Sequence, residues 1–519
     1  MKRYRLFYTL LLLLAAACYD DKGNYNYQDI NEVTISGIRS DYNVMMLNDT
    51  LRITPVIEMT EGDYRDTSRF KYVWFALKSG VRDTAGNHFE LNYPVTLGPG
   101  DYDFHFKIWD KKYDAIWKTR TSLTVGTLYT RGIMLAGEGT GGNAELQIIS
   151  MVTDTIICPD ILKDSGLPPL QGAIRALHTG TYTQFDSYVK MWVLTRSGAY
   201  SIDRLTQKSS EANDFNNLVY SMDDISEPLI PMDIIPQIKD YAGANGGQAQ
   251  RAVVCSNGDI FVSYMALLGG DFYSNSINRE QDNFHVRLKA KPFLMYSVNS
   301  MNSFVWYDGD NERFMRYASF ILATTSAFSA PLPDRDGEVF PWDQKATGRT
   351  LVYSENTRNS DNGSTNGNTF TLMKDKTGAY FIYKFYASAT VAKRAFYQID
   401  LTKATGFDQA KFYAFSSRRT LLFYVVGNDL YAYDYNPGNE RCVKLPGFGT
   451  DEITMVKFDT QIDPTVNPLY IATYNASSKG TLQRYHVETN PDVIEITPMA
   501  TSKWSGLTKI KDMSWRATR

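Results

Sequence analysis

The stretch that decides the fold reads LLFYVVGNDLYAYDY and covers residues 421–435. Two runs rich in Leu, Val, Phe and Tyr flank the tight polar turn Gly-Asn-Asp at 427–429. Aromatic and β-branched residues favour strands, and Gly and Asn accept the positive φ angles that hairpin turns require. The stretch therefore predicts a β-hairpin.

Six further stretches repeat this pattern along the chain. They are RGIMLAGEGTGGNAELQIISM (131–151), KMWVLTRSGAYSIDR (190–204), RAVVCSNGDIFVSYM (251–265), SFVWYDGDNERFMRY (303–317), TLMKDKTGAYFIYKFY (371–386) and LYIATYNASSKGTLQRY (469–485). A spacing of about 50 residues is typical of a β-propeller, in which each blade is a four-stranded sheet. We predict an all-β chain with a seven-bladed propeller over residues 127–519. Eight blades are the alternative, if 205–248 holds another.

The first hairpin, at 131–151, has no innermost strand of its own before it. The last strand-like run, GLTKIKDMSW at 506–515, is a candidate for that place. We predict that it pairs with Gly132–Glu138 and closes the ring, because closure removes open sheet edges.

Residues 31–126 form a separate predicted unit. Within 102–108, Tyr, Phe, Phe and Ile alternate with Asp, His and Lys, so one strand face is apolar and the other polar. Such strands over about 100 residues predict a β-sandwich. We expect Trp74 to pack between the sheets and His105 to lie on the surface.

The N-terminus carries a processing signal. Positive residues, the apolar run 6–14 and three alanines at 15–17 directly precede Cys18. This resembles a bacterial lipobox, which predicts a signal peptide at 1–17 and lipidation of Cys18. The alternative is a plain secretory peptide with an incidental cysteine.

A polar stretch follows the cysteine, and residues 18–30 are predicted to form a flexible tether. Asp20 and Asp21 resemble the signal that exports Bacteroidota lipoproteins to the outer face of the outer membrane. The alternative is an ordinary polar tether.

The other cysteines, Cys158, Cys255 and Cys442, have no zinc-site spacing. We interpret them as small buried hydrophobes, with one disulfide among them left open as an alternative. A formal net charge of −3 gives no electrostatic case for nucleic acid.

The sequence holds no recognisable catalytic constellation. It lacks G-x-S-x-G, and its five histidines show no HExxH or HxH spacing. We predict no catalytic residue, metal or cofactor, although scattered carboxylates leave a glycosidase open. Asp308-Gly-Asp-Asn-Glu312 is interpreted as a hairpin turn rather than a calcium loop. Trp342 and Tyr273, in Gly- or Pro-containing loops, are the candidate ligand-binding residues.

The whole pattern resembles the PKD-like family of Bacteroidota surface lipoproteins. The resemblance rests on the lipobox, Tyr72-Val-Trp74, Leu97–Tyr102, and the segments YTRGIMLAGE and AELQIIS that open the second unit. It implies an immunoglobulin-type PKD-like sandwich followed by the propeller. It also implies partnership with a SusC-type TonB-dependent transporter and its SusD-type lipoprotein.

From this resemblance we expect a non-catalytic accessory subunit of such an importer. It would be lipid-anchored in the outer membrane, face the cell exterior, and help capture or deliver an oligomeric nutrient, either glycan or peptide. One alternative is a surface glycan-degrading enzyme, a glycosidase or lyase, on a propeller scaffold. Another is a structural or cell-contact protein with no ligand.

Overall fold

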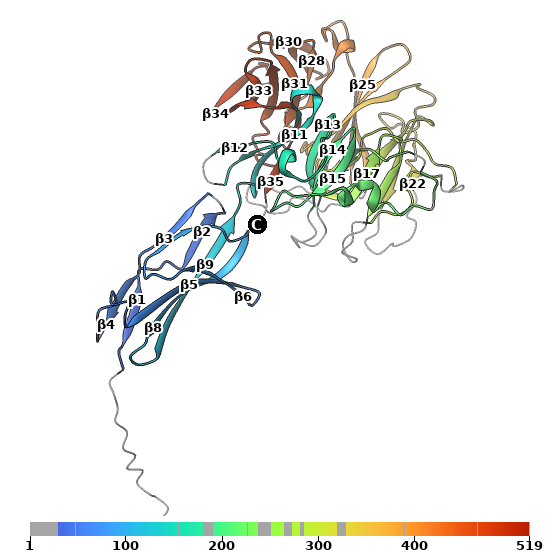
Figure 1. Cartoon of the computed structure of the whole chain (residues 1–519). Helices are drawn as coiled ribbons and strands as arrows, with labels where there is room; N and C mark the ends of the chain where they lie inside the picture. Colours follow the sequence, from blue (N-terminus) through green and yellow to red (C-terminus); the bar gives the residue numbers. More distant parts are fainter. Residues whose placement is uncertain are drawn as a thin grey trace, which may run out of the picture. The chain divides into compact units, whose positions relative to one another are not determined.

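The computed structural model describes residues 30–517 except 47, 153–154, 180–189, 226, 237–250, 264–271, 281–284, 319–328, 389 and 464. The chain divides into two compact units, residues 1–127 and 128–519. Both consist of β-strands, which Figure 1 colours along the sequence. No helix in the described residues is long and apolar enough to cross a membrane.

The described part of the first unit is built from nine strands. They are β1 (Val33–Ser36), β2 (Asp41–Met45), β3 (Thr50–Ile53), β4 (Val56–Met59), β5 (Phe70–Lys78), β6 (Val81–Gly86), β7 (Leu91–Pro94), β8 (Gly100–Asp110) and β9 (Ala115–Gly126). Five of them form a sheet in the order β2-β9-β8-β5-β6, and β1–β4 and β3–β7 form two separate pairs. Strand β2 runs parallel to β9, whereas the other pairs are antiparallel.

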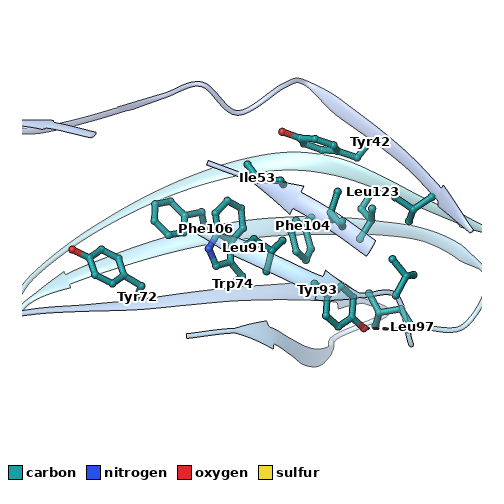
Figure 2. Close-up of a cluster of buried hydrophobic side chains, with 14 of the residues drawn as sticks. Tyr42, Ile53, Tyr72, Trp74, Leu91, Tyr93, Leu97, Phe104, Phe106 and Leu123 are labelled. Carbon is teal, nitrogen blue, oxygen red and sulfur yellow. Dashed lines mark hydrogen bonds between the residues drawn. The ribbon is translucent and has the colours of Figure 1, made fainter. Parts of the chain in front are cut away.

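The core of this unit confirms the role predicted for Trp74. Its side chain is fully buried and stacks on Phe106, with ring centroids 4.3 Å apart, and its indole N–H donates to the carbonyl of His88 at 3.0 Å. Figure 2 shows this cluster, to which the five-stranded sheet and the β3–β7 pair both contribute.

The prediction for His105 is wrong. Its imidazole is buried against the ring of Phe75, with centroids 4.9 Å apart, because that polar face is also partly covered.

The second unit consists of seven sheets in the described residues. Their strands are β10 (Arg131–Glu138), β11 (Ala144–Ser150), β12 (Ile156–Cys158), β13 (Ala173–Thr179), β14 (Lys190–Thr195), β15 (Gly198–Ile202), β16 (Pro231–Ile234), β17 (Arg251–Cys255), β18 (Ile260–Ser263), β19 (Met295–Ser297), β20 (Ser300–Asp308), β21 (Arg313–Ala318), β22 (Ser329–Pro331), β23 (Thr350–Asn356), β24 (Thr369–Lys374), β25 (Tyr380–Ala387), β26 (Val391–Gln398), β27 (Tyr413–Phe415), β28 (Leu421–Val426), β29 (Asp429–Asp434), β30 (Arg441–Leu445), β31 (Glu452–Phe458), β32 (Leu469–Asn475), β33 (Lys479–Val487), β34 (Ile496–Leu507) and β35 (Lys509–Ala517).

Short 3₁₀ turns connect some of these strands. They are η1 (Thr140–Gly142), η2 (Leu162–Asp164), η4 (Glu211–Asn213), η5 (Phe215–Leu218), η6 (Asp361–Gly363) and η7 (Phe407–Gln409).

Each of the seven predicted hairpins supplies two adjacent strands of one sheet, which confirms the propeller pattern. The opening hairpin β10–β11 takes its neighbouring strand from the far end of the chain. Strand β35 pairs antiparallel with β10, with Gly132 opposite Arg516 and Glu138 opposite Lys509. This confirms the predicted ring closure. In the described part of 205–248 only β16 is a strand, and it belongs to the third sheet, so no eighth blade is found there.

Two further sequence interpretations can be checked here. The turn after Asp308 is a hairpin turn, as interpreted, because the Asp308 carboxylate accepts from the backbone N–H groups of Asp310 and Asn311, both at 3.2 Å. Cys158, Cys255 and Cys442 are free thiols, so no disulfide links them. Cys158 and Cys255 are buried, and Cys442 is partly buried.

Candidate functional site

A central cavity of about 460 Å³ runs along the axis of the ring. Each of the seven sheets contributes residues from its first strand, or from β35 in the closing sheet. These inner strands are β13, β16, β19, β23, β27, β31 and β35. Because all seven sheets line the central cavity, we take it as the candidate functional site.

Five of the inner strands carry a β-bulge where they line the cavity. In β13, for example, Ala173 pairs with Thr195 and Arg175 pairs with Leu194, so Ile174 has no partner. A bulge bends its strand and re-aims the next side chain. In all five strands the residue directly after the unpaired one lines the cavity. These residues are Arg175, Asp233, Tyr353, Met455 and Asp512.

The bulges bring together a network of four charged groups. Asp512 accepts from Arg175 Nε at 3.1 Å and from Lys457 Nζ at 2.6 Å, and Arg175 also pairs with Asp233. Burial alone would raise the pKa of Asp512, but Lys457 and Arg175 hold that pKa below its usual value. Asp512 therefore stays ionised and ties its own strand to β13 and β31, the inner strands on either side.

The pKa of Asp233 behaves differently from that of Asp512. Burial raises it above the usual value, and the nearby Asp512 adds to this, although Arg175 acts in the opposite direction. Arg175 lies between the two carboxylates, and despite its burial they raise its pKa, so the guanidinium stays charged.

A fifth ionisable group, Glu355 on β23, faces the same cavity. Its Oε2 accepts from the backbone N–H of Phe415 at 2.7 Å and from the Tyr353 hydroxyl at 3.4 Å. Burial raises the pKa of Glu355 to about 7, so its carboxyl is close to half protonated at neutral pH. The carboxyl groups that line the cavity thus include an ionised one, Asp512, and one poised to exchange a proton, Glu355.

Aromatic side chains complete the lining. The Tyr353 ring lies between those of Phe293 and Tyr413, with centroids 6.0 and 5.4 Å away, and Phe412 and Trp515 also contribute. Apolar faces beside a few fixed polar groups are typical of sites that bind organic ligands. Among the described residues, no group of three or more His, Cys, Asp or Glu side chains could hold a metal ion.

The two candidate ligand-binding residues from the sequence do not lie in this cavity. Trp342 is 4% exposed and packs edge-to-face against Phe314 and Phe385. Tyr273 is 1% exposed and packs against Phe215. Both loops fold their aromatic residue back into the core, so neither side chain is open to a ligand in this structure. Cys18, Asp20 and Asp21 lie outside the described residues.

Sequence reasoning missed the charged network. Its one signal was the presence of charges inside otherwise apolar inner strands, such as Lys511-Asp512 within the predicted closing strand. Nothing in the sequence marks the bulges, since an unpaired residue is defined by its partner strand.

The PKD-like family model matches residues 18–172. The matched range covers the described strands of the first unit and extends into the strands that open the ring. The matched range begins at Cys18, the residue that we predicted to be lipidated. No curated protein matches the chain significantly.

Several solved structures are similar at low sequence identity. A quinonprotein alcohol dehydrogenase-like protein from Bacteroides thetaiotaomicron is 12% identical with a TM-score of 0.38, covering 94% of this chain and 99% of its own. The WD40 domain of SCAP from fission yeast is 8% identical with a TM-score of 0.28, over 66% of this chain and 74% of that one. SGBP-B from a Bacteroides ovatus mixed-linkage glucan utilization locus, in complex with a heptasaccharide, is 9% identical with a TM-score of 0.16, over 74% and 78%. At these values we base no functional argument on the similarity.

Proposed function

We propose that this chain is a surface lipoprotein and a non-catalytic accessory subunit of a SusC/SusD-type importer. It is anchored in the outer membrane through lipid on Cys18, faces the cell exterior, and helps capture or deliver an oligomeric nutrient. The observation that carries the proposal is the family match, which begins at Cys18 and continues into the ring. The SusC-type and SusD-type partners are inferred from the resemblance to the PKD-like family.

The chemistry of the central cavity supports a binding role. Asp233 and Asp512 both pair with Arg175, and Asp512 also pairs with Lys457. A carboxylate whose pKa is held low by two cations is a weak base, and one that bridges three strands has little freedom to move. The aromatic rings beside these pairs offer apolar contact to a ligand.

The anchor is tested by fractionating cells that express the wild type, Cys18→Ala, or the matched control Cys442→Ala. We expect the wild type and Cys442→Ala to take up labelled palmitate and to sediment with the outer membrane. Cys18→Ala should do neither. If Cys18→Ala stayed membrane-bound, the proposal that lipid on Cys18 anchors the chain would be refuted.

The importer role is tested by a pull-down from solubilised outer membrane with the tagged wild-type chain. Recovery of a TonB-dependent transporter together with a SusD-type lipoprotein is the expected result. If no transporter is recovered, the accessory role is refuted. Surface location is tested separately with the double variant Asp20→Asn, Asp21→Asn. This variant should keep the lipid, but in whole cells it should lose the sensitivity to proteinase K that we expect of the wild type.

Glu355 favours one second candidate, the surface glycan-degrading enzyme. A carboxyl with a pKa of about 7 facing the same cavity as an ionised carboxylate is the pattern of a general acid with a partner. This candidate predicts release of reducing ends from a polysaccharide by the wild type and none by Glu355→Gln. Equal release by both proteins, or none by either, would rule out Glu355 as a catalytic acid.

A further inference from the structure

A second surface of the propeller, away from the central cavity, exposes large apolar side chains. Tyr220, Met222 and Phe272 are 64%, 93% and 59% exposed. The rings of Tyr220 and Phe272 meet edge-to-face with centroids 5.2 Å apart. We call these three residues the aromatic patch. Exposed apolar groups that touch one another are more informative than scattered ones.

The backbone holds the aromatic patch outward. Residues 218–220 run parallel to 272–273, with the Tyr220 N–H donating to the Tyr273 carbonyl at 2.7 Å and the Tyr273 N–H to the Leu218 carbonyl at 2.9 Å. In extended chain, neighbouring side chains point to opposite faces. Since Tyr273 is locked into the core against Phe215, Phe272 is forced out.

Polar contacts fix the third member of the patch. The Met222 N–H donates to Asn275 Oδ1 at 2.7 Å, and the Ser221 hydroxyl donates to the same oxygen at 3.1 Å. The backbone that carries the aromatic patch is therefore preformed, and a ligand would not have to order that backbone on binding.

An acidic hollow of about 600 Å³ adjoins the patch. Its nine lining residues are Asp214, Asn216, Val219, Ser221, Asp223, Ile225, Glu227, Pro228 and Leu229, and none of them is a lysine or arginine. Residues 209–230 as a whole contain no basic side chain and five carboxylates, those of Glu211, Asp214, Asp223, Asp224 and Glu227.

Two of these carboxylates are already used inside the protein. Asp223 pairs with Arg279, and Asp214 accepts from the Asn216 N–H at 2.8 Å. Asp224 and Glu227 are exposed and form no ion pair with any described residue. The rim of the patch therefore keeps a net negative charge that is open to a ligand.

We propose that the aromatic patch and the acidic hollow bind a short peptide that carries an apolar side chain next to lysine or arginine. The apolar side chain packs on Tyr220 and Phe272, and the cation lies between Asp224 and Glu227, where it can also contact an aromatic face. This rests on the proposed function and gives it a cargo class, peptide rather than glycan.

Size and charge select this ligand over two others. The three side chains offer on the order of 400 Å², well below the roughly 800 Å² per partner of a stable protein–protein interface. A neutral glycan would feel no charge attraction from the net negative rim, whereas a cationic peptide is attracted by it.

The test is calorimetric titration of the full chain with two synthetic peptides of matched size, acetyl-GKLKFG-amide and acetyl-GELEFG-amide, and with cellohexaose as the glycan. We expect the lysine peptide to bind and the other two not to. Tyr220→Ala should weaken its binding at least tenfold, and Asp224→Asn or Glu227→Gln about threefold each. Leu401→Ala, which shortens an exposed side chain elsewhere in this unit, is the matched control and should change nothing.

Three results would overturn the proposal. These are equal binding of the glutamate peptide, lysine-peptide binding that Tyr220→Ala leaves unchanged, and cellohexaose binding that Tyr220→Ala abolishes. The importer role and the cargo class can be refuted independently of each other. A chain that co-purifies with a transporter but binds no lysine peptide refutes only the cargo class, and a chain that binds the peptide but recovers no transporter refutes only the accessory role.

Discussion

Replacing Asp512 by Asn removes the charge that joins three inner strands of the ring. In the wild type, the carboxylate accepts from Arg175 at 3.1 Å and from Lys457 at 2.6 Å, and its side chain is only 13% exposed. Hydrogen bonds to a charged group contribute about 1.5–3 kcal/mol each. Asn keeps one acceptor oxygen but removes the carboxylate partner of Lys457 and one of the two carboxylate partners of Arg175, so we expect a loss of about 3 kcal/mol in the free energy of unfolding.

Calorimetry can measure this loss as a shift in melting temperature. The entropy of unfolding is about 2.1 cal/mol/K per residue, or about 0.8 kcal/mol/K for a unit of roughly 400 residues. A loss of 3 kcal/mol therefore lowers the Tm by about 4 °C. The affected transition is the one with the larger enthalpy, because the ring is the larger unit.

The control is Asp429→Asn, which breaks a pair of similar length, 2.7 Å to Lys444, between two exposed side chains. Exposed pairs contribute little, so its Tm should stay within about 1 °C of the wild type. The sign of the pH dependence adds a check. Because the folded-state pKa of Asp512 is lowered, its stabilisation is present above the unfolded pKa and is lost as the pH falls through the folded pKa. Equal shifts for both variants, or a deficit for Asp512→Asn that persists in strong acid, would refute the reasoning.

Three other predictions follow from buried groups. Trp74→Ala should lower the free energy of unfolding of the first unit by about 4 kcal/mol, measured as its separate calorimetric transition, because the indole is fully buried. For Glu355, the raised folded-state pKa means that wild-type stability falls as the pH rises from about 4.5 to about 7, and Glu355→Gln should flatten the Tm profile over that range; parallel profiles would contradict this. Reducing agent should leave the Tm unchanged, since Cys158, Cys255 and Cys442 are free thiols; a Tm that drops on reduction would reveal a disulfide.

Much of the fold could be predicted because it depends on local patterns. Hairpin turns such as Gly-Asn-Asp at 427–429 are fixed by the residues in them, and the alternation in 102–108 marks an apolar face directly. Ring closure could be predicted because the hairpin at 131–151 had no inner strand of its own, whereas the strand-like run at 506–515 belonged to no hairpin.

The side chains were harder to place because their burial depends on distant parts of the chain. Trp342 stands in a loop rich in Pro and Gly, but Phe314 and Phe385 from two other strands cover it. His105 lies on the polar face of its strand and is buried because Phe75 of the neighbouring strand stacks on it. The charged network in the cavity depends on bulges, which only the pairing of strands defines.

The closing strand also sets a time order for folding. The Thr508 N–H donates to Gln147 Oε1 at 2.9 Å across 361 residues of chain. Contacts of such separation carry a high closure entropy and form slowly. Until residues 509–517 have been synthesised, the inner edge of β10 stays unpaired and can join other chains. The chain is therefore prone to mispairing during this interval, and a nascent chain stalled before residue 509 is a natural target for chaperones and proteases.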